Sequence, residues 1–107
     1  MAINKLAEGF TWAETAGEDL SDSVHKLVKL GTTGLVLCGD NEKPLGAVFE
    51  AAAEGAPASV YWASIIKAPA AAAITKGARV ACGTSGRVKT STGTNPIGIA
   101  LNGATAA

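Results

Sequence analysis

Two stretches of the sequence decide the fold, VKLGTTGLVLCGDNEKPLG at residues 28–46 and VACGTSGRVKTSTGTNPIG at residues 80–98. They align without a gap at an offset of 52 residues, and seven of the 19 positions are identical. The identical pairs are Val28/Val80, Gly31/Gly83, Thr32/Thr84, Gly34/Gly86, Val36/Val88, Pro44/Pro96 and Gly46/Gly98. Ordinary residue frequencies would give roughly one or two identities, so the pattern indicates an internal duplication. The alternative is coincidence in a Gly- and Thr-rich chain, because turn residues recur for physical reasons alone.

Each copy of the repeat has the pattern of a three-stranded β-meander. In the first copy, apolar residues alternate along residues 24–30 and lead into GTTG, where glycine permits a tight reversal. A short strand and a polar loop follow. The proline that ends the loop cannot donate to a β-ladder and so marks the entrance of the next strand. In that last strand we expect Leu45, Ala47 and Phe49 to share one face.

The predicted class is all-β, a small barrel or sandwich built from two similar β-meander units, with an N-terminal arm. We place the arm at residues 1–23 and the β domain at residues 24–107, and expect residues 28–49 to superpose on residues 80–101. One such unit could not bury its apolar face alone, whereas two packed together could.

The segment between the two copies differs in character from both. SVYWASII at residues 59–66 is β-branched and aromatic, which predicts a further strand. PAAAAI at residues 69–74 favours helix by its alanines but is too short, so we expect a loop or one helical turn.

The leader at residues 1–23 differs from the rest in charge. It carries one base and five acids, a net of −4, whereas residues 24–107 carry eight bases and four acids, a net of +4. We predict that the leader is an arm lying on another protein. Its expected contact residues are two apolar anchors and three acids, namely Phe10, Trp12, Glu14, Glu18 and Asp19. The alternative is that the aromatic pair closes one end of the domain's own core.

Composition points to a protein that binds other subunits. The chain has 22 alanines and 13 glycines but only 27 larger apolar residues among 107, so its core is thin and part of it should be ordered by neighbours. Zero net charge argues against binding of nucleic acid or membrane. We expect no signal peptide and no membrane span, because no apolar run is long enough.

No pattern in the sequence predicts catalysis, a metal or a cofactor. His25 is the single histidine and is expected on the solvent-leaning face of a strand. The GTTG and GTSG turns lack the spacing of a phosphate loop, and the acidic leader lacks that of a calcium loop. Cys38 and Cys82 have no metal-ligand spacing. We interpret them as free thiols in a reducing cytoplasm or as small buried residues, with a disulfide as the less favoured alternative.

The order and spacing of several stretches resemble the capsid cement, or head decoration, family of tailed bacteriophages. DSVHKLVKLGTTG is similar to the opening strand and turn of that family, KPLGAVFEAAAEGAPASVYW to its central stretch, and ITKGARVACGTSGRVKTST with NPIGIAL to its closing passage. The resemblance covers roughly residues 22–101. Two features depart from it: no further strand is expected after NPIGIAL, and the acidic leader is long.

The resemblance implies a noncatalytic virion protein, made in the host cytoplasm and located on the outer surface of the phage head. It implies contact with the major capsid protein, bridging of neighbouring capsid subunits and self-association as a homotrimer. Two other functions remain open. A small ligand- or carbohydrate-binding β module would need an aromatic platform, which the adjacent Tyr61 and Trp62 cannot form from one strand. A noncatalytic subunit of an enzyme is the third.

Overall fold

The computed structural model describes residues 10–62 and 66–105, and these residues form the all-β fold that the sequence predicts. The eight strands are β1 (Phe10–Thr15), β2 (Leu27–Leu30), β3 (Leu35–Leu37), β4 (Gly46–Glu50), β5 (Pro57–Trp62), β6 (Arg79–Cys82), β7 (Val88–Thr90) and β8 (Gly98–Ile99). A single 3-10 turn, η1 (Thr84–Gly86), is the one helical element of the described chain. The alanine-rich residues 69–74 form a loop with isolated β-bridges, as expected.

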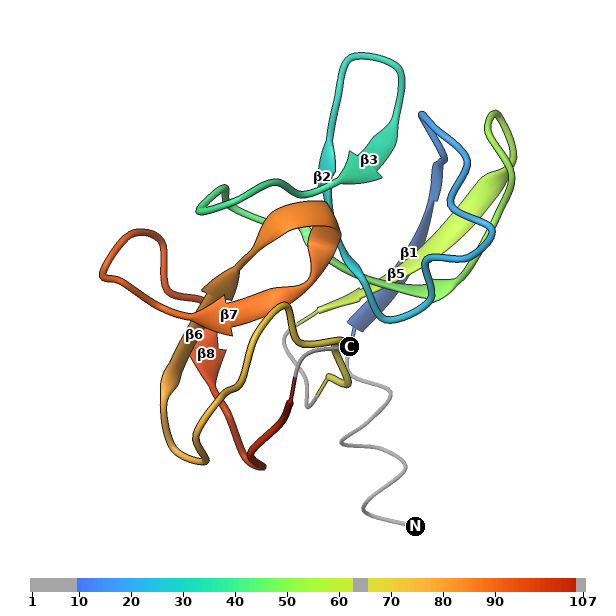
Figure 1. Ribbon diagram of the computed structural model, residues 1–107. Helices are drawn as coiled ribbons and strands as arrows, with labels where there is room; N and C mark the ends of the chain where they lie inside the picture. The colour runs from blue at the N-terminus through green and yellow to red at the C-terminus, as the bar shows by residue number, and fades with distance from the viewer. Residues whose placement is uncertain (1–9, 63–65, 106–107) are drawn as a thin grey trace, which may run out of the picture.

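The strands form two antiparallel sheets, one with the order β1-β5-β4-β2-β3 and the other with the order β7-β6-β8 (Figure 1). The two edges of the larger sheet meet, because Ala16 bridges Leu35 and the Gly17 amide donates to the Leu35 carbonyl at 2.7 Å. This sheet therefore curls into a small, partly closed barrel. Its interior is filled by seven buried residues: Ala16, Leu20, Val28, Leu35, Val48, Ala58 and Val60.

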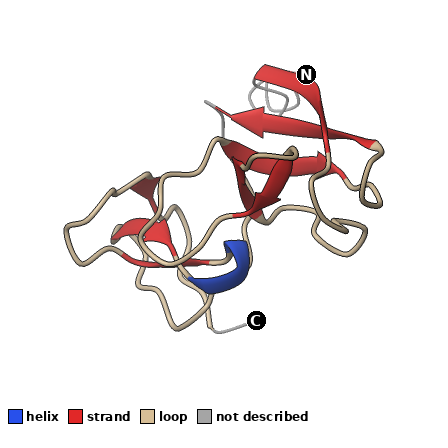
Figure 2. Ribbon diagram, turned by 90° about the horizontal axis from the view of Figure 1, so that it is seen from above, coloured by secondary structure: helices blue, strands red, loops and turns tan. Residues whose placement is uncertain are grey.

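The larger sheet is buried on both faces. Val28 lies in the barrel interior, whereas its neighbour Leu27 belongs to a second cluster that faces the smaller sheet. The second cluster comprises Leu27, Cys38, Ala47, Tyr61 and Cys82. Figure 2 shows the two sheets as separate lobes with η1 between them. The sequence predicts strands that bury only one face, and this is wrong in detail. Leu30 and Phe49, expected on core faces, are 56% and 46% exposed. Elsewhere in β2 and β4, neighbouring residues that point to opposite faces are both buried.

The two repeat units share their strand order and one strand register. The units are β3-β2-β4 and β7-β6-β8. The Leu45 amide donates to the Val28 carbonyl at 2.7 Å, and the Ile97 amide donates to the Val80 carbonyl at 2.8 Å, which is the same bond displaced by 52 residues. The hairpins differ by one residue, because η1 lengthens the second turn. That the units arose by duplication stays a prediction.

Most of the leader belongs to the β body. Strand β1 pairs along its whole length with β5, and Leu20 is fully buried in the barrel interior. Backbone pairing and apolar burial thus integrate residues 10–23 with the β strands. The division into an arm at residues 1–23 and a domain from residue 24 stays a prediction. Residues 1–9 lie outside the described part of the chain.

Two glycines of the repeat occupy turns that press against backbone. Gly34 has φ +138°, and a Cβ there would overlap the Thr15 carbonyl oxygen. Gly86 has φ +73°, and a Cβ there would lie 2.6 Å from the Leu27 carbonyl oxygen. Only glycine combines this conformation with this clearance. Gly34 thus closes the barrel against β1, and Gly86 docks the second unit on the first.

The loop after β3 carries a second tie between the units. Glu42 accepts hydrogen bonds from Lys29 Nζ at 2.7 and 2.8 Å and from the Gly39 amide at 2.6 Å. These bonds fix the loop at residues 39–42. The loop reaches the smaller sheet, where the Asn41 amide donates to the Cys82 carbonyl at 2.9 Å. Its neighbour Asp40 pairs with Lys89 at 2.7 Å.

We expect Gly34→Ala to lower the free energy of unfolding by roughly 3 kcal/mol or more, because it adds a backbone clash to an unfavourable φ. Gly93→Ala is the matched control. Gly93 has φ +107°, but no atom lies within 4 Å of the place that a Cβ would take, so only the conformational cost of about 1 kcal/mol applies. Urea denaturation measures both. Equal losses for the two variants would contradict the close-approach argument.

The Glu42 contacts predict a pH-dependent contribution to stability. The hydrogen bond from Lys29 holds the pKa of Glu42 below its ordinary value of 4.5. The ionised carboxylate therefore stabilises the fold above about pH 4.5, and this stabilisation is lost as the pH falls through the lower folded-state pKa. The melting temperature of Glu42→Gln should lie below that of the wild type at pH 7, and the difference should shrink as the pH falls below 4.5. A difference independent of pH would contradict this role.

Candidate partner-binding groove

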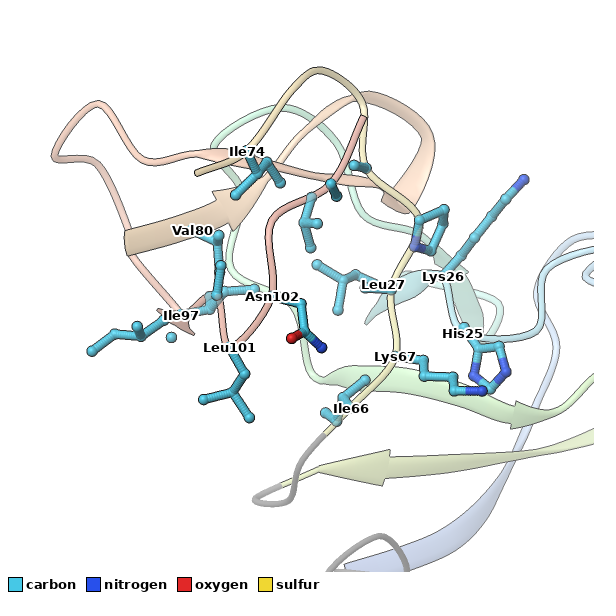
Figure 3. A pocket seen from close by; sticks show the side chains of 18 of the residues that line it. His25, Lys26, Leu27, Ile66, Lys67, Ile74, Val80, Ile97, Leu101 and Asn102 are labelled. Carbon is cyan, nitrogen blue, oxygen red and sulfur yellow. The ribbon is translucent and has the colours of Figure 1, made fainter. Parts of the chain in front are cut away.

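An open groove of about 1080 Å³ lies between the two sheets. Its apolar lining comes from segments far apart in the sequence, as Figure 3 shows for Leu27, Ile66 and Val80. The complete lining consists of Val24, His25, Lys26, Leu27, Ile66, Lys67, Ala68, Pro69, Ala70, Ile74, Val80, Val88, Ile97, Gly98, Ile99, Ala100, Leu101, Asn102, Gly103 and Ala104.

Large apolar side chains gather on the rim of this groove. Six such side chains are well exposed in the described residues, and four of them line the groove. They are Val24 at 42%, Ile97 at 41%, Ile99 at 62% and Leu101 at 59% exposed. Three of them, Ile97, Ile99 and Leu101, belong to one short segment of the chain, and a group of exposed apolar side chains on a small domain is characteristic of a protein interface.

This apolar rim has its origin in the end of the second repeat unit. In the first unit, β5 pairs with the edge of β4 that β2 leaves open. The equivalent strand of the second unit, β8, pairs only with β6 in its sheet. Residues 97–101, the equivalents of residues 45–49 in the first unit, line the groove.

The opposite end of the groove is polar and basic. In Figure 3 His25, Lys26 and Lys67 lie together there, away from Ile97. The Tyr61 hydroxyl lies 3.1 Å from His25 Nδ1 and also forms a hydrogen bond with the Lys67 backbone. Burial raises the pKa of Tyr61, an effect that the Lys67 bond partly offsets.

His25 is not the surface strand residue that the sequence predicts. It precedes β2 in a turn at φ 72° and is half-buried. Its amide donates to the Val48 carbonyl at 2.8 Å, which fixes the turn against β4. The positive φ replaces the expected alternation at this point, so the side chain turns toward Tyr61.

Of the contact residues predicted in the leader, Glu14, Glu18 and Asp19 are not among the described residues that line the groove. Glu14 is half-buried in β1, opposite Ala58. Glu18 accepts the Leu37 amide at 2.6 Å, and Asp19 accepts the Ser21 amide at 3.1 Å. Hydrogen bonding to Ser21 lowers the pKa of Asp19.

The remaining two predicted contacts are aromatic. The backbones of Phe10 and Trp12 belong to β1, and their side chains lie outside what the structure describes. Their proposed contact with a partner therefore stays a prediction.

The described lining of the groove is mostly apolar. Among the described residues it contains no carboxylate and no Phe, Tyr or Trp, the side chains that an aromatic platform for a sugar needs. Among residues 10–62 and 66–105, no group of three His, Cys, Asp or Glu side chains could hold a metal ion. Within the same residues, no helix has the length and hydropathy needed to cross a membrane.

Comparison with known proteins gives one match. A family model described as phage cement protein matches residues 9–107, which includes both sheets and the groove. No curated protein and no solved structure matches the chain. The family has a structural role in the phage capsid. With the match extending over nearly the whole length, the chain belongs to the phage cement protein family.

Proposed function

We propose that this protein binds the outer surface of the phage head and bridges neighbouring major capsid subunits. The single observation that carries this proposal is the groove between the sheets, whose rim exposes Ile97, Ile99 and Leu101. Family membership supplies the capsid as the setting. The bridging and the site are inferred from the surface that the fold leaves uncovered.

The proposed occupant of the groove is an extended segment of a major capsid subunit. Its apolar side chains would cover the Ile97–Leu101 rim, which supplies affinity by removing that surface from water. Its carboxylates would lie at the end formed by His25, Lys26 and Lys67. The described lining of the groove has two lysines and no acid, so this charge arrangement favours one direction of the segment over the other.

Bridging requires a second contact, which we assign to the leader. Asp19 and Asp22 are exposed, and the leader is the acidic part of a chain whose remainder is basic. We propose that this face meets basic groups of an adjacent copy or of a neighbouring capsid subunit, with Phe10 and Trp12 as apolar anchors. Contact between adjacent copies would give the proposed homotrimer. Exposed ion pairs contribute about 0–1 kcal/mol each, so their role is orientation.

The groove is tested by Leu101→Asp, which places a desolvated charge in the proposed interface. We expect affinity for undecorated heads to fall by roughly tenfold or more, measured by a co-sedimentation titration. Leu30→Asp is the matched control: Leu30 is 56% exposed against 59% for Leu101 but does not line the groove. Its affinity should change by less than about threefold.

The two variants separate loss of binding from loss of folding, because circular dichroism and melting temperature are measured on both. Wild-type affinity in a folded Leu101→Asp variant would exclude the groove as the capsid contact. Equal loss of affinity in both variants would mean that the contact is not specific to the groove.

The leader is tested by deletion of residues 1–9 alone, since removal of residues 1–20 would also remove β1 and Leu20 from the barrel. We expect the deletion to weaken head binding. Trp12→Ala should weaken it more than Glu14→Ala does, because an aromatic anchor buried in an interface commonly contributes ~2 kcal/mol or more and an ion pair near the surface little. Melting curves of each variant control for folding. Undiminished affinity after both the deletion and Trp12→Ala would exclude the leader as a contact.

A further inference from the structure

The two cysteines lie together at the junction of the two sheets. Cys38 follows β3 of the larger sheet and Cys82 ends β6 of the smaller one. Both are 0% exposed and belong to the cluster that joins the sheets. The Cys82 thiol donates a hydrogen bond to the Gly83 carbonyl at 3.3 Å. Residues 44 positions apart in the sequence thus share one buried cluster.

Backbone hydrogen bonds hold the two segments side by side independently of the thiols. The Gly86 amide donates to the Cys38 carbonyl at 2.8 Å, and the Asn41 amide donates to the Cys82 carbonyl at 2.9 Å. These bonds are reciprocal, since each cysteine carbonyl accepts from the loop that follows the other cysteine. The approach of the two cysteines is therefore set by the main chain.

We propose that Cys38 and Cys82 are a latent disulfide, which forms when the protein leaves a reducing environment and staples the two sheets together. This inference goes beyond the capsid role and does not depend on it. In the reducing cytoplasm the pair stays as free thiols. The oxidant that the proposal requires is a low-molecular-weight disulfide of the surrounding medium.

The reaction balances in two exchange steps. The thiolate of one cysteine attacks one sulfur of the small disulfide, which forms a mixed disulfide and releases one small thiol. The thiolate of the other cysteine then attacks the protein sulfur of that mixed disulfide, which closes the protein disulfide and releases the second small thiol. Both cysteine protons pass to the released thiolates, so two protein thiols are oxidised as one small disulfide is reduced.

The environment of the two thiols makes both steps slow. Burial raises the pKa of Cys38 and that of Cys82. Because the thiolate is the nucleophile and both sulfurs are buried, we expect oxidation over hours rather than seconds.

The consequence of the bond is a stronger junction between the sheets. The polar ties across it are few: besides the two cysteine carbonyl bonds, Asn95 Nδ2 donates to the Asn41 carbonyl at 2.8 Å and Lys89 pairs with Asp40. A covalent link across the junction would restrict the unfolded chain over a long loop, which stabilises the folded state.

The test uses the full chain, purified with reductant and then incubated at pH 8 with oxidised glutathione. We expect an intramolecular disulfide, seen as a monomer lighter by two hydrogen atoms that no longer reacts with a thiol alkylating agent in denaturant. Its melting temperature should exceed that of the reduced protein by roughly 10 °C or more. Dithiothreitol should restore the lower value.

The melting temperatures of the reduced and oxidised forms are compared on the same sequence. The test therefore does not depend on whether a cysteine variant folds. Cys38→Ala is a second control, which should yield no monomeric disulfide and no rise in melting temperature. Persistence of two alkylatable thiols, or formation of glutathione adducts or dimers alone, would overturn the proposal. So would an intramolecular disulfide that leaves the melting temperature unchanged or lowers it.

Discussion

The fold depends on two places where a hairpin turn touches the backbone of another strand with no side chain between them. At Gly34 the first turn meets Thr15 and joins the edges of the larger sheet; at Gly86 the second turn meets Leu27 and joins the two repeat units. Both glycines have positive φ, which lets the chain reverse tightly and removes the Cβ that would separate the surfaces. The barrel interior and the junction of the sheets can close only because these approaches are possible.

Close approach has a further consequence for how the chain uses its few large apolar residues. The larger sheet is covered on both faces, so neighbours such as Leu27 and Val28 contribute to different clusters. Small residues, including Ala47 and Ala58, fill positions where the backbones lie near one another. A chain with 22 alanines can therefore build two apolar clusters. The smaller sheet has no comparable cover, and its last strand leaves Ile99 exposed at the rim of the groove.

The two sheets thus have different parts in the proposed function. The larger one forms a closed body, and in the proposed complex the smaller one would present an apolar surface to a capsid subunit. Such a surface would transmit force between subunits only if its own sheet is held firmly to the body. Cys38 and Cys82 lie in the cluster that joins the two sheets, and the loop fixed by Glu42 connects the sheets at the same place. The proposed disulfide would strengthen this junction.

The sequence by itself determined the all-β class, the two units with their turns, and the family resemblance, because turn glycines, prolines and alternating apolar residues act locally. It could not determine which faces are buried, since Leu30, Phe49 and Leu101 follow the same alternation as core residues and only the neighbouring strand decides their exposure. Nor could it show that residues 10–23 belong to the barrel or that Glu18 caps the Leu37 amide. The groove and the buried cluster that contains Cys38 and Cys82 join segments far apart in the chain. Such contacts arise from packing of whole sheets, which no local pattern records.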